Sequence, residues 1–543
     1  MTHTTEMPPE ARRSPITSRS GRFIALAVIC LAELLVVLDN TIVNVALPSI
    51  GVELRTNVSG LQWVVDAYTL TFAGLLLAFG NLGDRHGRRK IMIVGLIGVG
   101  VMSVAGAMSG SLEQVIAARA AMGIFAAAVF PATLALIINI FDDSRERALA
   151  IAAWTAMAGF AIAIGPMSGG WLLEHFSWHS VFWINVPVAA VAVLAVLRWV
   201  PESKSSKVSR VDKLGIVLSI TGITLLVWAI IEAPRYGWLS STTLGVGIGA
   251  VAILVGFVAW ELHTASPILD MRLFRNRRFA LPALAIAIAY FSMFGFLFLI
   301  TQYFQGVREY TPFEFGVASL PFAVSVAVGA PVATLLAQRI GSTAVIVTGL
   351  LLTGLGLFLG GLVDVNSSYL IDVLPSMVFM ALGLGIVQGP ATESIMSSLP
   401  LDEAGAGSAV NDTTREIGGT LGVAVLGSIV ASYYSSKVSP LIDQVPDAMM
   451  SDDEKGFAKA SVLSVLEMRE REVPQIFDAS RETLITSMKS AVLEGSHTAS
   501  LVATGSVLIC AVVVAVFLPW APADNDSVLL AWERRTDEQQ EGR

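Results

Sequence analysis

Charged residues are scarce in this chain. Only 14% of its 543 residues are Asp, Glu, Lys or Arg, whereas a soluble domain carries about 25%. The mean hydropathy is +0.69 and 54% of the residues are hydrophobic. This composition excludes an ordinary soluble domain and indicates a membrane protein. The basic residues lie in short loops and form no stripe, so we expect no nucleic-acid partner.

Residue patterns for nucleotide, metal and redox chemistry are missing as well. No G-x-x-x-x-G-K-S/T phosphate loop occurs, which argues against an ATP-driven pump. The six histidines form no metal or nucleophile arrangement, so we expect no enzyme, no metal site and no cofactor. The two cysteines, Cys30 and Cys510, fall inside apolar segments without metal spacing. We expect both to be buried thiols rather than a disulfide.

Long apolar runs make up most of the chain. A bilayer crossing needs about 20 mostly apolar residues in a helix. The runs are too long for barrel strands and do not alternate. The sequence therefore predicts an all-α integral membrane protein with fourteen transmembrane helices. The predicted spans are 23–47, 59–80, 91–109, 113–139, 148–173, 180–199, 214–232, 242–262, 279–301, 315–338, 342–362, 370–398, 407–432 and 497–519.

The distribution of basic residues predicts the orientation. Short loops after odd-numbered helices hold at most one lysine or arginine each. The loops after even-numbered helices hold Arg85, Arg88, Arg89, Lys90, Arg145, Arg147, Lys204, Lys207, Arg210, Arg272, Arg275, Arg277 and Arg278. Because cytoplasmic loops carry an excess of Lys and Arg, both termini are predicted to be cytoplasmic. The polar start of the chain lacks a cleavage site, so the first helix is predicted to remain in the cytoplasmic membrane.

One connection is much longer than the others. Residues 433–496 are polar and mixed in charge, and the predicted topology places them outside the cell. Within them, Phe457, Val462, Val465 and Leu466 fall on roughly one helical face. We favour a small helical excursion packed on the outer surface, and a functional lid is the alternative.

The loop after the second predicted helix has a specific pattern. It begins at Gly80 and reads GNLGDRHGRRK. Gly80 and Gly87 allow a tight backbone path, while Asp84, Arg85 and Arg88 bring opposite charges to the membrane face. A basic loop alone is a topology anchor. The spacing G-x-L-x-D-R-x-G-R-R-K, however, resembles the signature loop of the major facilitator superfamily.

Further segments match the same family in the same order. In AARAAMGIFAAAVFP, Arg119 and Gly123 stand as in the family's second signature. The segment GFAIAIGPMSGGW resembles the signature associated with antiporters. The residues that carry this antiporter motif are Gly165, Pro166, Gly169 and Gly170. LDNTIVNVALP, WHSVFWINVP, GLGLGIVQGPATESIM and GAGSAVNDTTREIGGTLGVAVLGS resemble segments of the fourteen-helix drug:proton antiporter branch.

The resemblance implies an architecture. Two six-helix bundles are expected to rock about a site at the membrane midplane, with two helices inserted between them. The expected parts are a cytoplasmic tail at 1–22, an N-terminal bundle at 23–199, a linker with the inserted helices at 200–278, a C-terminal bundle at 279–519 that includes the external loop, and a cytoplasmic tail at 520–543. Ala161 departs from the antiporter motif, where glycine is usual. The tenth predicted helix lacks the acid that some relatives carry, which leaves the range of divalent cations open.

Two aspartates lie within the first two predicted helices. A carboxylate near the bilayer centre costs at least about 2.5–3.5 kcal/mol on insertion scales, so it usually has a function. Asp39 in LLVVLDNTIVNVALP either binds protons or cargo, which we favour, or supports a neighbouring helix. Burial favours the neutral form of a carboxyl group, as a proton-coupled site requires. Asp66 lies beside Trp63 and Tyr68, which either anchor the helix at the interface or attract a cation with it.

Charged residues in later helices have both coupling and structural interpretations. Arg119 needs a partner acid or carbonyl, and the resemblance favours proton coupling over a static ion pair. Glu393 is the acid that we expect to bind protons or substrate in the second bundle, because exporters of lipophilic cations in this branch resemble the chain in carrying acids on helices 1, 2 and 12. Arg415 and Glu416 can form an in-membrane pair, for which a structural role is at least as favoured as transport. Glu33 is expected to be solvated near the cytoplasmic interface.

Asp84 has a separate expected role as a latch. A negative charge near a helix N-terminus interacts favourably with the helix dipole. The thirteenth predicted helix begins on the cytoplasmic side, so Asp84 is expected to hold its start when the inner gate is closed. This hypothesis follows from the family pattern.

These features predict a secondary active transporter rather than an enzyme. The leading hypothesis is a proton-coupled antiporter that exports amphipathic, often cationic, small molecules by alternating access. Its expected partners are protons, such molecules and the lipid bilayer, with a monomer as the working unit. A dedicated exporter of a lipid, siderophore or endogenous metabolite is the alternative with the same fold. A non-transporting sensor is a third, against which the retained membrane charges argue.

Overall fold

The computed structural model describes residues 18–141, 143–204, 212–264, 267–398, 404–446, 450–470 and 478–520. Across these ranges the regular structure is helical and contains no strand. In a membrane each backbone N–H and C=O must be bonded within its own segment, which a helix achieves. The all-α membrane fold that the sequence predicts is therefore confirmed.

The first part of the chain forms one bundle, the N-terminal half. Its helices are α1 (Arg19–Glu53), α2 (Val58–His86), α3 (Arg88–Ala107), α4 (Leu112–Ile140), α5 (Ser144–His175), α6 (Ser180–Trp183) and α7 (Asn185–Trp199). Asn57 caps α2, since its side chain accepts a hydrogen bond from the Gly60 N–H at 2.8 Å. Helix α1 packs along α5, and α4 packs between α2 and α3.

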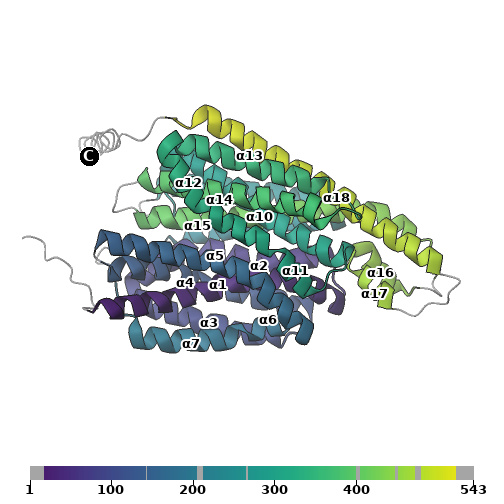
Figure 1. Ribbon diagram of the computed structural model, residues 1–543, viewed down its shortest axis with the longest axis horizontal. Helices are drawn as coiled ribbons and strands as arrows, with labels where there is room; N and C mark the ends of the chain where they lie inside the picture. The colour runs from purple at the N-terminus through teal and green to yellow at the C-terminus, as the bar shows by residue number, and fades with distance from the viewer. Residues whose placement is uncertain are drawn as a thin grey trace, which may run out of the picture.

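The last part forms a second bundle, the C-terminal half. It contains α10 (Arg277–Gln302), the π-helical turn η2 (Tyr303–Val307), α11 (Pro312–Ala318), α12 (Leu320–Ile340), α13 (Ser342–Gly361), the π-helical turn η3 (Tyr369–Val373), α14 (Leu374–Ser397), α15 (Ala404–Ile442), α16 (Asp452–Ala460), α17 (Ser464–Glu470) and α18 (Asp478–Phe517). The two halves lie as two layers in Figure 1, the N-terminal half below and the C-terminal half above.

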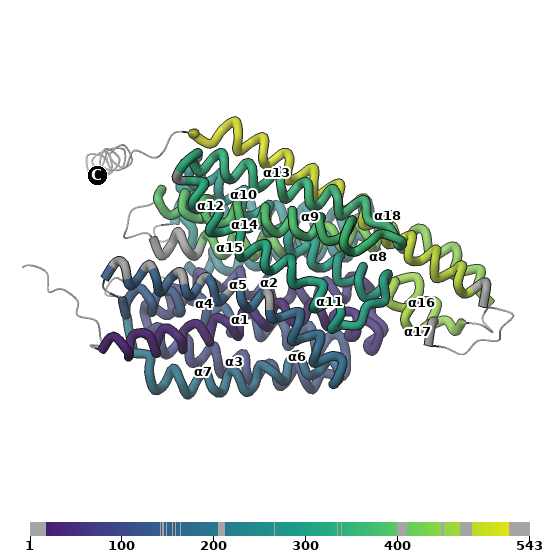
Figure 2. The backbone as a smooth tube through the Cα atoms, viewed as in Figure 1, coloured from purple at the N-terminus to yellow at the C-terminus, as the bar shows by residue number. Residues whose placement is uncertain are grey.

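Between the halves in sequence stand α8 (Lys213–Tyr236), α9 (Ser241–His263) and the short 3-10 helix η1 (Met271–Arg275). Helices α8 and α9 pair with each other, and α8 packs against both α2 and α15. Figure 2 labels them beside the helices of the C-terminal half. The inserted pair therefore contacts one helix from each half.

The number of spans is close to the prediction but does not match it. In the described part of the chain, thirteen helices are long and apolar enough to cross a membrane. Helix α5 stands at the fifth predicted span and is not among the thirteen, although its 148–165 segment carries no charged residue. Cys30 and Cys510 are buried free thiols, as expected.

The long polar connection is shorter than the sequence suggests. Helix α15 continues to Ile442 and α18 begins at Asp478, so both extend into the predicted loop 433–496. Helices α16 and α17 form the expected excursion, at the end of the molecule opposite the start of α1 and the end of α18 (Figure 1). Phe457 is 4% exposed and Leu463 is fully buried, so this excursion packs tightly. We call its end of the molecule the distal end, and the end that carries residues 18 and 520 the terminal end.

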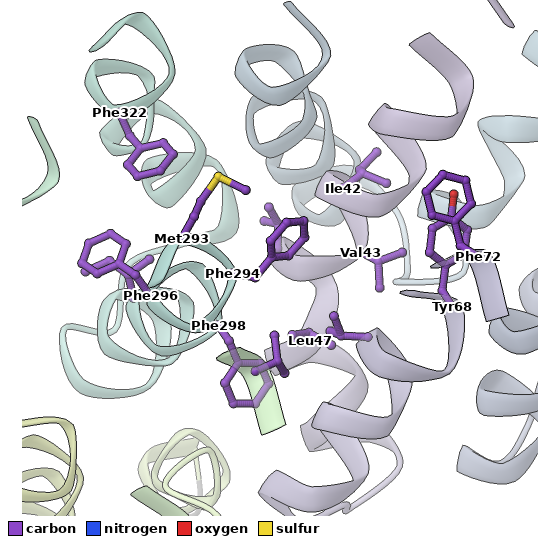
Figure 3. Close-up of a cluster of buried hydrophobic side chains, with 14 of the residues drawn as sticks. Ile42, Val43, Leu47, Tyr68, Phe72, Met293, Phe294, Phe296, Phe298 and Phe322 are labelled. Carbon is purple, nitrogen blue, oxygen red and sulfur yellow. The ribbon is translucent and has the colours of Figure 1, made fainter. Parts of the chain in front are cut away.

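Contacts between the two halves gather from the middle of the molecule to the distal end. An apolar seam runs between α1 and α10, where Ile42 and Leu47 lie across from Phe294 and Phe298 (Figure 3). Gln305 in η2 donates to the Val45 carbonyl at 3.0 Å. The distal end is thus closed by direct contact between the halves.

Candidate functional site

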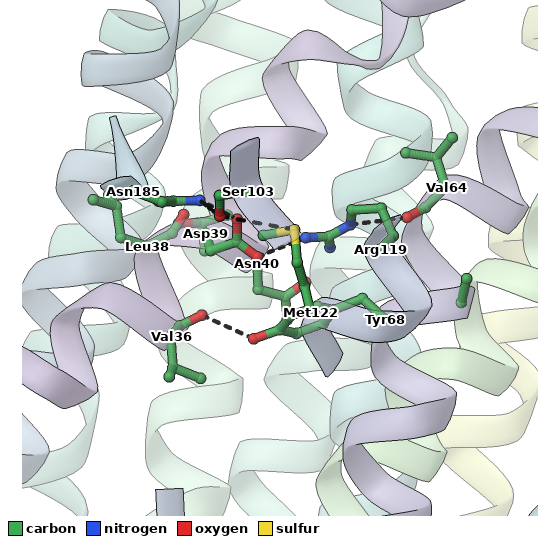
Figure 4. A network of polar contacts seen from close by, with 12 residues as sticks. Val36, Leu38, Asp39, Asn40, Val64, Tyr68, Ser103, Arg119, Met122 and Asn185 are labelled. Carbon is green, nitrogen blue, oxygen red and sulfur yellow. Dashed lines mark hydrogen bonds and ion pairs between the residues drawn. The ribbon is translucent and has the colours of Figure 1, made fainter. Parts of the chain in front are cut away.

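The centre of the N-terminal half holds a buried ion pair. The Arg119 Nη1 lies 2.6 Å from the Asp39 Oδ2, and neither side chain is more than 1% exposed. The other Asp39 oxygen accepts a hydrogen bond from the Asn185 Nδ2 at 2.6 Å, and that amide also donates to the Ser103 Oγ at 3.3 Å. Four helices, α1, α3, α4 and α7, therefore meet at one carboxylate (Figure 4).

Arg119 has two further neighbours on α2. Its Nε donates to the Val64 carbonyl at 3.1 Å, and its guanidinium carbon lies 4.2 Å from the centre of the Tyr68 ring. The predicted acid and carbonyl partners are both present. A cation over an aromatic face in a dry site is stabilised further, by about 2 kcal/mol or more. The Tyr68 hydroxyl donates to the Val36 carbonyl at 3.3 Å and so ties α2 to α1.

Asp66 lies deeper than an interfacial residue would. It is fully buried on α2, and neither carboxylate oxygen has a hydrogen-bond partner among the described residues. Three positions earlier, Trp63 donates to Glu232 of α8 at 3.3 Å. Three positions later, Thr69 accepts from Thr420 of α15 at 2.8 Å. Because residues three and four apart are neighbours on a helix, Asp66 stands where α2, α8 and α15 meet.

Gln62 strengthens this junction one turn before Asp66. Its Nε2 donates to the carbonyls of Val423 and Ala424 on α15, at 2.8 and 2.9 Å. On the α8 side, Leu70 packs in a small cluster with residues of α8 and α15. The unpartnered carboxyl group is therefore enclosed by the contact between the two halves.

A second set of acids lies toward the terminal end, on α15 and α1. Asp412 and Glu416 are one turn apart on α15 and interact electrostatically with each other and with Arg415. Glu416 also interacts with Tyr68 of α2. Across the interface Glu33 of α1 interacts with Asp412. We call Glu33, Asp412, Arg415 and Glu416 the acidic cluster.

Arg415 is the one basic member of the acidic cluster. Its Nη1 lies 3.5 Å from the Asp412 Oδ1, and its Nη2 donates to the Thr392 Oγ1 of α14 at 3.2 Å. Its guanidinium carbon lies 5.5 Å from the ring centre of Tyr290. The sequence suggests an in-membrane pair of Arg415 with Glu416, whereas Arg415 forms its ion pair with Asp412. The reason is helical geometry: residues three apart share a face, and direct neighbours do not.

Glu393 is placed apart from these acids. It is exposed on α14, and the described residues give it no hydrogen bond or ion pair. The preceding residue, Thr392, is the one that reaches α15, through Arg415 and Asn411. A step of one residue turns about 100° around a helix, so Glu393 points along a different direction.

The signature loop is compressed to a single residue. Helix α2 ends at His86, α3 begins at Arg88, and Gly87 between them has φ of +116°. Only glycine adopts this backbone conformation easily. Asp84 pairs with Arg88 at 2.7 Å, and Arg88 also donates to the Ala135 carbonyl of α4 at 3.2 Å. The loop therefore fastens α2 to α3 and α4 within the N-terminal half.

Two other glycines and one arginine of the motifs have simpler surroundings. A Cβ on Gly80 would meet the Pro131 side chain of α4 at an ordinary 3.6 Å. Arg85 is exposed in the last turn of α2. Gly123 of the second signature packs closely against α2, because a Cβ added at Gly123 would lie 2.3 Å from the Tyr68 carbonyl oxygen.

The antiporter motif of α5 lies between helices of both halves. A Cβ on Gly165 would meet the Thr41 Oγ1 of α1 at 2.1 Å, and one on Gly170 would meet the Pro312 carbonyl of α11 at 2.4 Å. Small residues at such positions let helix backbones approach closely. The Pro166 carbonyl likewise faces Gly316 of α11, and Gly169 packs on α1. The motif therefore joins α5 to α1 on one side and to α11 on the other.

The order of helices, the paired loop residues and the antiporter motif agree with a comparison of the whole sequence. Residues 29–423 match the sequence model of a protein family, the Major Facilitator Superfamily. The chain belongs to the Major Facilitator Superfamily. It is therefore a multi-pass membrane transporter and not an enzyme, as the sequence motifs predict.

Named relatives of this transporter share most of its length. It is 34% identical to the multidrug efflux pump LfrA of Mycolicibacterium smegmatis over 508 residues, which cover 94% of this chain and 98% of the relative. It is 36% identical to the multidrug resistance protein Stp of Mycobacterium tuberculosis over 415 residues, 76% of this chain and 77% of the relative.

The solved structures support the same fold for the transporter. It superposes on a bacterial homologue of the human lysosomal transporter Spinster, in an inward-facing and unoccupied conformation, with a TM-score of 0.62. The two chains are 15% identical, and the match covers 93% of this chain and all of the other. At this identity the likeness concerns the fold alone.

The sequence did not predict the buried positions of three polar residues of the transporter. Asn185 bonds Asp39, and an amide within the apolar run VFWINVPVAA is the signal that marks it. Asp412 has its signal in the spacing to Glu416, which puts both acids on one helical face. Glu33 was expected in solvent, yet it is fully buried with neither oxygen hydrogen-bonded within the described residues.

Proposed function

We propose that this transporter is a proton-coupled antiporter that exports amphipathic, often cationic, compounds across the cytoplasmic membrane by alternating access. Its relatives over most of the chain carry the names of multidrug efflux and resistance proteins. The terminal end is taken to face the cytoplasm, in line with the basic residues of its loops. A single chain is taken as the working unit.

The main support for this proposal is the burial of Asp66. Its carboxyl group is fully buried without a partner at the meeting point of α2, α8 and α15. An isolated charge in a low dielectric is expensive, so this group is favoured in its neutral, protonated form while the halves touch. When α2 separates from α15, water reaches the group and stabilises its ionised form. Proton binding and the closed distal contact therefore favour each other.

Asp39 and Arg119 have a different part in this proposal. Their 2.6 Å pair satisfies both charges in a dry site, with Asn185 on the remaining oxygen. The contacts of Asp39 with Arg119 and Asn185 hold α1, α4 and α7 together. A proton that binds Asp39 would release Arg119, so the pair is proposed as a second position of proton coupling. Asp39 is proposed to take up a proton less readily than Asp66, because protonation breaks its ion pair with Arg119.

In the C-terminal half the acids of α15 are better supported than Glu393. Asp412 and Glu416 interact electrostatically with residues of α1 and α2 in the opposite half, whereas Glu393 is exposed and pairs with none of the described residues. A site at which both halves contribute charge responds to their separation. Substrate recognition is therefore proposed at the acidic cluster, with Glu393 as a residue of the pathway toward it.

The signature loop and the antiporter motif are proposed to control the movement of the two halves. Asp84 is proposed to exchange Arg88 for the start of α15 when the terminal end closes, because a carboxylate is stabilised at a helix N-terminus. The antiporter motif of α5 is proposed to keep α1, α5 and α11 in close contact, which restricts leakage between the two half-channels. Transport by Asp84→Asn that matches the wild type, with an unchanged balance of inward and outward states, would contradict the latch.

The test of proton coupling uses proteoliposomes with a pH-sensitive dye inside and tetraphenylphosphonium as the added cation. The wild type should couple cation movement to proton flux. Asp66→Asn should bind the cation and lose the linked flux. Asp453→Asn is the matched control, since Asp453 is exposed in the first turn of α16. Linked flux in Asp66→Asn at the wild-type rate would contradict the role of Asp66, and no linked flux in the wild type with any lipophilic cation would contradict antiport.

A further inference from the structure

Glu33 is the member of the acidic cluster that comes from the N-terminal half. It sits six residues before Asp39 on α1, toward the terminal end. Its side chain is fully buried, and both carboxylate oxygens lack a hydrogen-bond partner in the described part of the molecule. A structural carboxylate would be expected to accept hydrogen bonds, because a buried polar group without them is costly.

The charged group outside α1 that interacts with Glu33 is another acid. Asp412 of α15 faces it from the C-terminal half. Glu416 follows Asp412 at a spacing of one helical turn, and its Oε2 is likewise buried without a partner in the described residues. Like charges that face each other repel, so this arrangement favours binding of a positive charge between them.

The charges of the acidic cluster do not balance. Three carboxyl groups, Glu33, Asp412 and Glu416, face one guanidinium, that of Arg415. Arg415 contacts Asp412 and Thr392, which both belong to the C-terminal half. Among the described residues, no basic side chain of α1 or α2 pairs with Glu33. With all three carboxyl groups ionised the site carries a net charge of −2, which bound protons or a bound cation neutralise.

Aromatic rings complete the surroundings. Tyr290 of α10 interacts with Asp412, Arg415 and Glu416, and Tyr68 of α2 interacts with Glu416. Ring faces attract cations, and the guanidinium groups of Arg415 and Arg119 already lie beside these two rings, 5.5 and 4.2 Å from the ring centres. The oxygens of Glu33 and the Oε2 of Glu416 have no hydrogen-bond donor among the described residues, so they suit a quaternary cation, which donates no hydrogen bond, better than a neutral polar molecule.

We infer that Glu33 and Asp412, one from each half, form a cation-binding position for the charged nitrogen or phosphorus centre of the exported compound, and that Glu416 offers a second position one turn deeper for dications. The inference rests on the proposed export function and adds the substrate class and residues. Because the position is shared between α1 and α15, it exists only while the terminal ends of these helices face each other. Rocking of the halves would pull the two acids apart and weaken the hold on the cation.

The experiment measures binding to the purified full-length protein in lipid nanodiscs. The probes are dequalinium as a dication and tetraphenylphosphonium as a monocation. Glu33→Gln should weaken dequalinium binding at least about tenfold, which corresponds to about 1.4 kcal/mol. Tetraphenylphosphonium binding should weaken less, because Glu416 still serves one charge. Glu33→Asp keeps the charge and should retain most of the affinity for both probes.

Asp412→Asn tests the same position from the other half, and it remains informative if Glu33→Gln fails to fold. The double variant should lose no more than about the larger single effect, since both residues serve one cation. Glu113→Gln is the matched control, because Glu113 is exposed at the start of α4. Unchanged binding of both probes in Glu33→Gln would overturn the inference.

Proton release on dequalinium binding separates the two roles that Glu33 can have. If Glu33→Gln binds dequalinium as tightly as the wild type and only releases fewer protons, Glu33 is a proton site and the inference is overturned. If the wild type binds both cations but shows no linked proton flux in proteoliposomes, the antiport proposal fails and the cation position stands. The two failures are therefore distinguishable.

Discussion

Removing either partner of the Asp39–Arg119 pair should damage the protein unequally. Both side chains are buried in the N-terminal half at 2.6 Å from each other. Asp39→Asn leaves a buried guanidinium, which cannot lose its proton in a protein. Arg119→Met leaves a carboxyl group, which can become neutral by taking up a proton. The asparagine variant is therefore the more destabilised of the two.

The magnitude follows from the number of groups left unpaired. Loss of one partner from a buried pair costs about 3–5 kcal/mol of unfolding free energy. Asp39→Asn should fall in this range, reduced by the Arg119 bonds to the Val64 carbonyl and the Tyr68 ring. Arg119→Met should cost less, about 1–3 kcal/mol, because protonated Asp39 retains Asn185 as a partner. The double variant should be more stable than Asp39→Asn alone.

The assay is unfolding in mixed detergent micelles, followed by tryptophan fluorescence, for the wild type, both single variants and the double variant. The cycle should give a coupling free energy of about 1–3 kcal/mol in favour of the pair. Equal effects of the two single variants, with additive loss in the double variant, would refute the reasoning. Transport by the stable double variant at the wild-type rate would show that the pair is structural only.

Three further changes test the packing of the motifs. Gly87→Ala should lower the unfolding free energy by about 1–3 kcal/mol, because φ of +116° is strained for alanine; Gly83→Ala in the adjacent helical turn should be nearly neutral in the same melt. Gly165→Val should cost about 1–3 kcal/mol by pushing α5 from α1, and Thr41→Ala should restore part of the loss in a double-variant melt. Leu463→Ala should cost about 2–5 kcal/mol, as for a buried leucine, and should raise hydrogen exchange in α16 and α17; unchanged exchange would mean that this contact does not hold them.

The amino-acid sequence determined the all-helical membrane fold and nearly the whole set of spans, because each apolar run is long enough to cross the bilayer and each must satisfy its own backbone. It also indicated Asp39, Arg119 and the antiporter motif as candidate functional residues, because a charge within an apolar run or a set of closely spaced glycines can be recognised from a single segment. The need of Arg119 for an acid or a backbone carbonyl followed from the cost of an unpaired guanidinium. The identities of these partners did not.

Tertiary structure alone decided which charges meet. Asn185 reaches Asp39 over 146 positions of chain, and Glu33 faces Asp412 from the opposite half. The same packing buries Asp66 without a partner and leaves Glu393 exposed. Hydropathy and helical period describe one segment at a time, whereas the environment of a carboxyl group depends on which other helices lie around it. That environment is a property of the assembled bundle, and no single segment contains it.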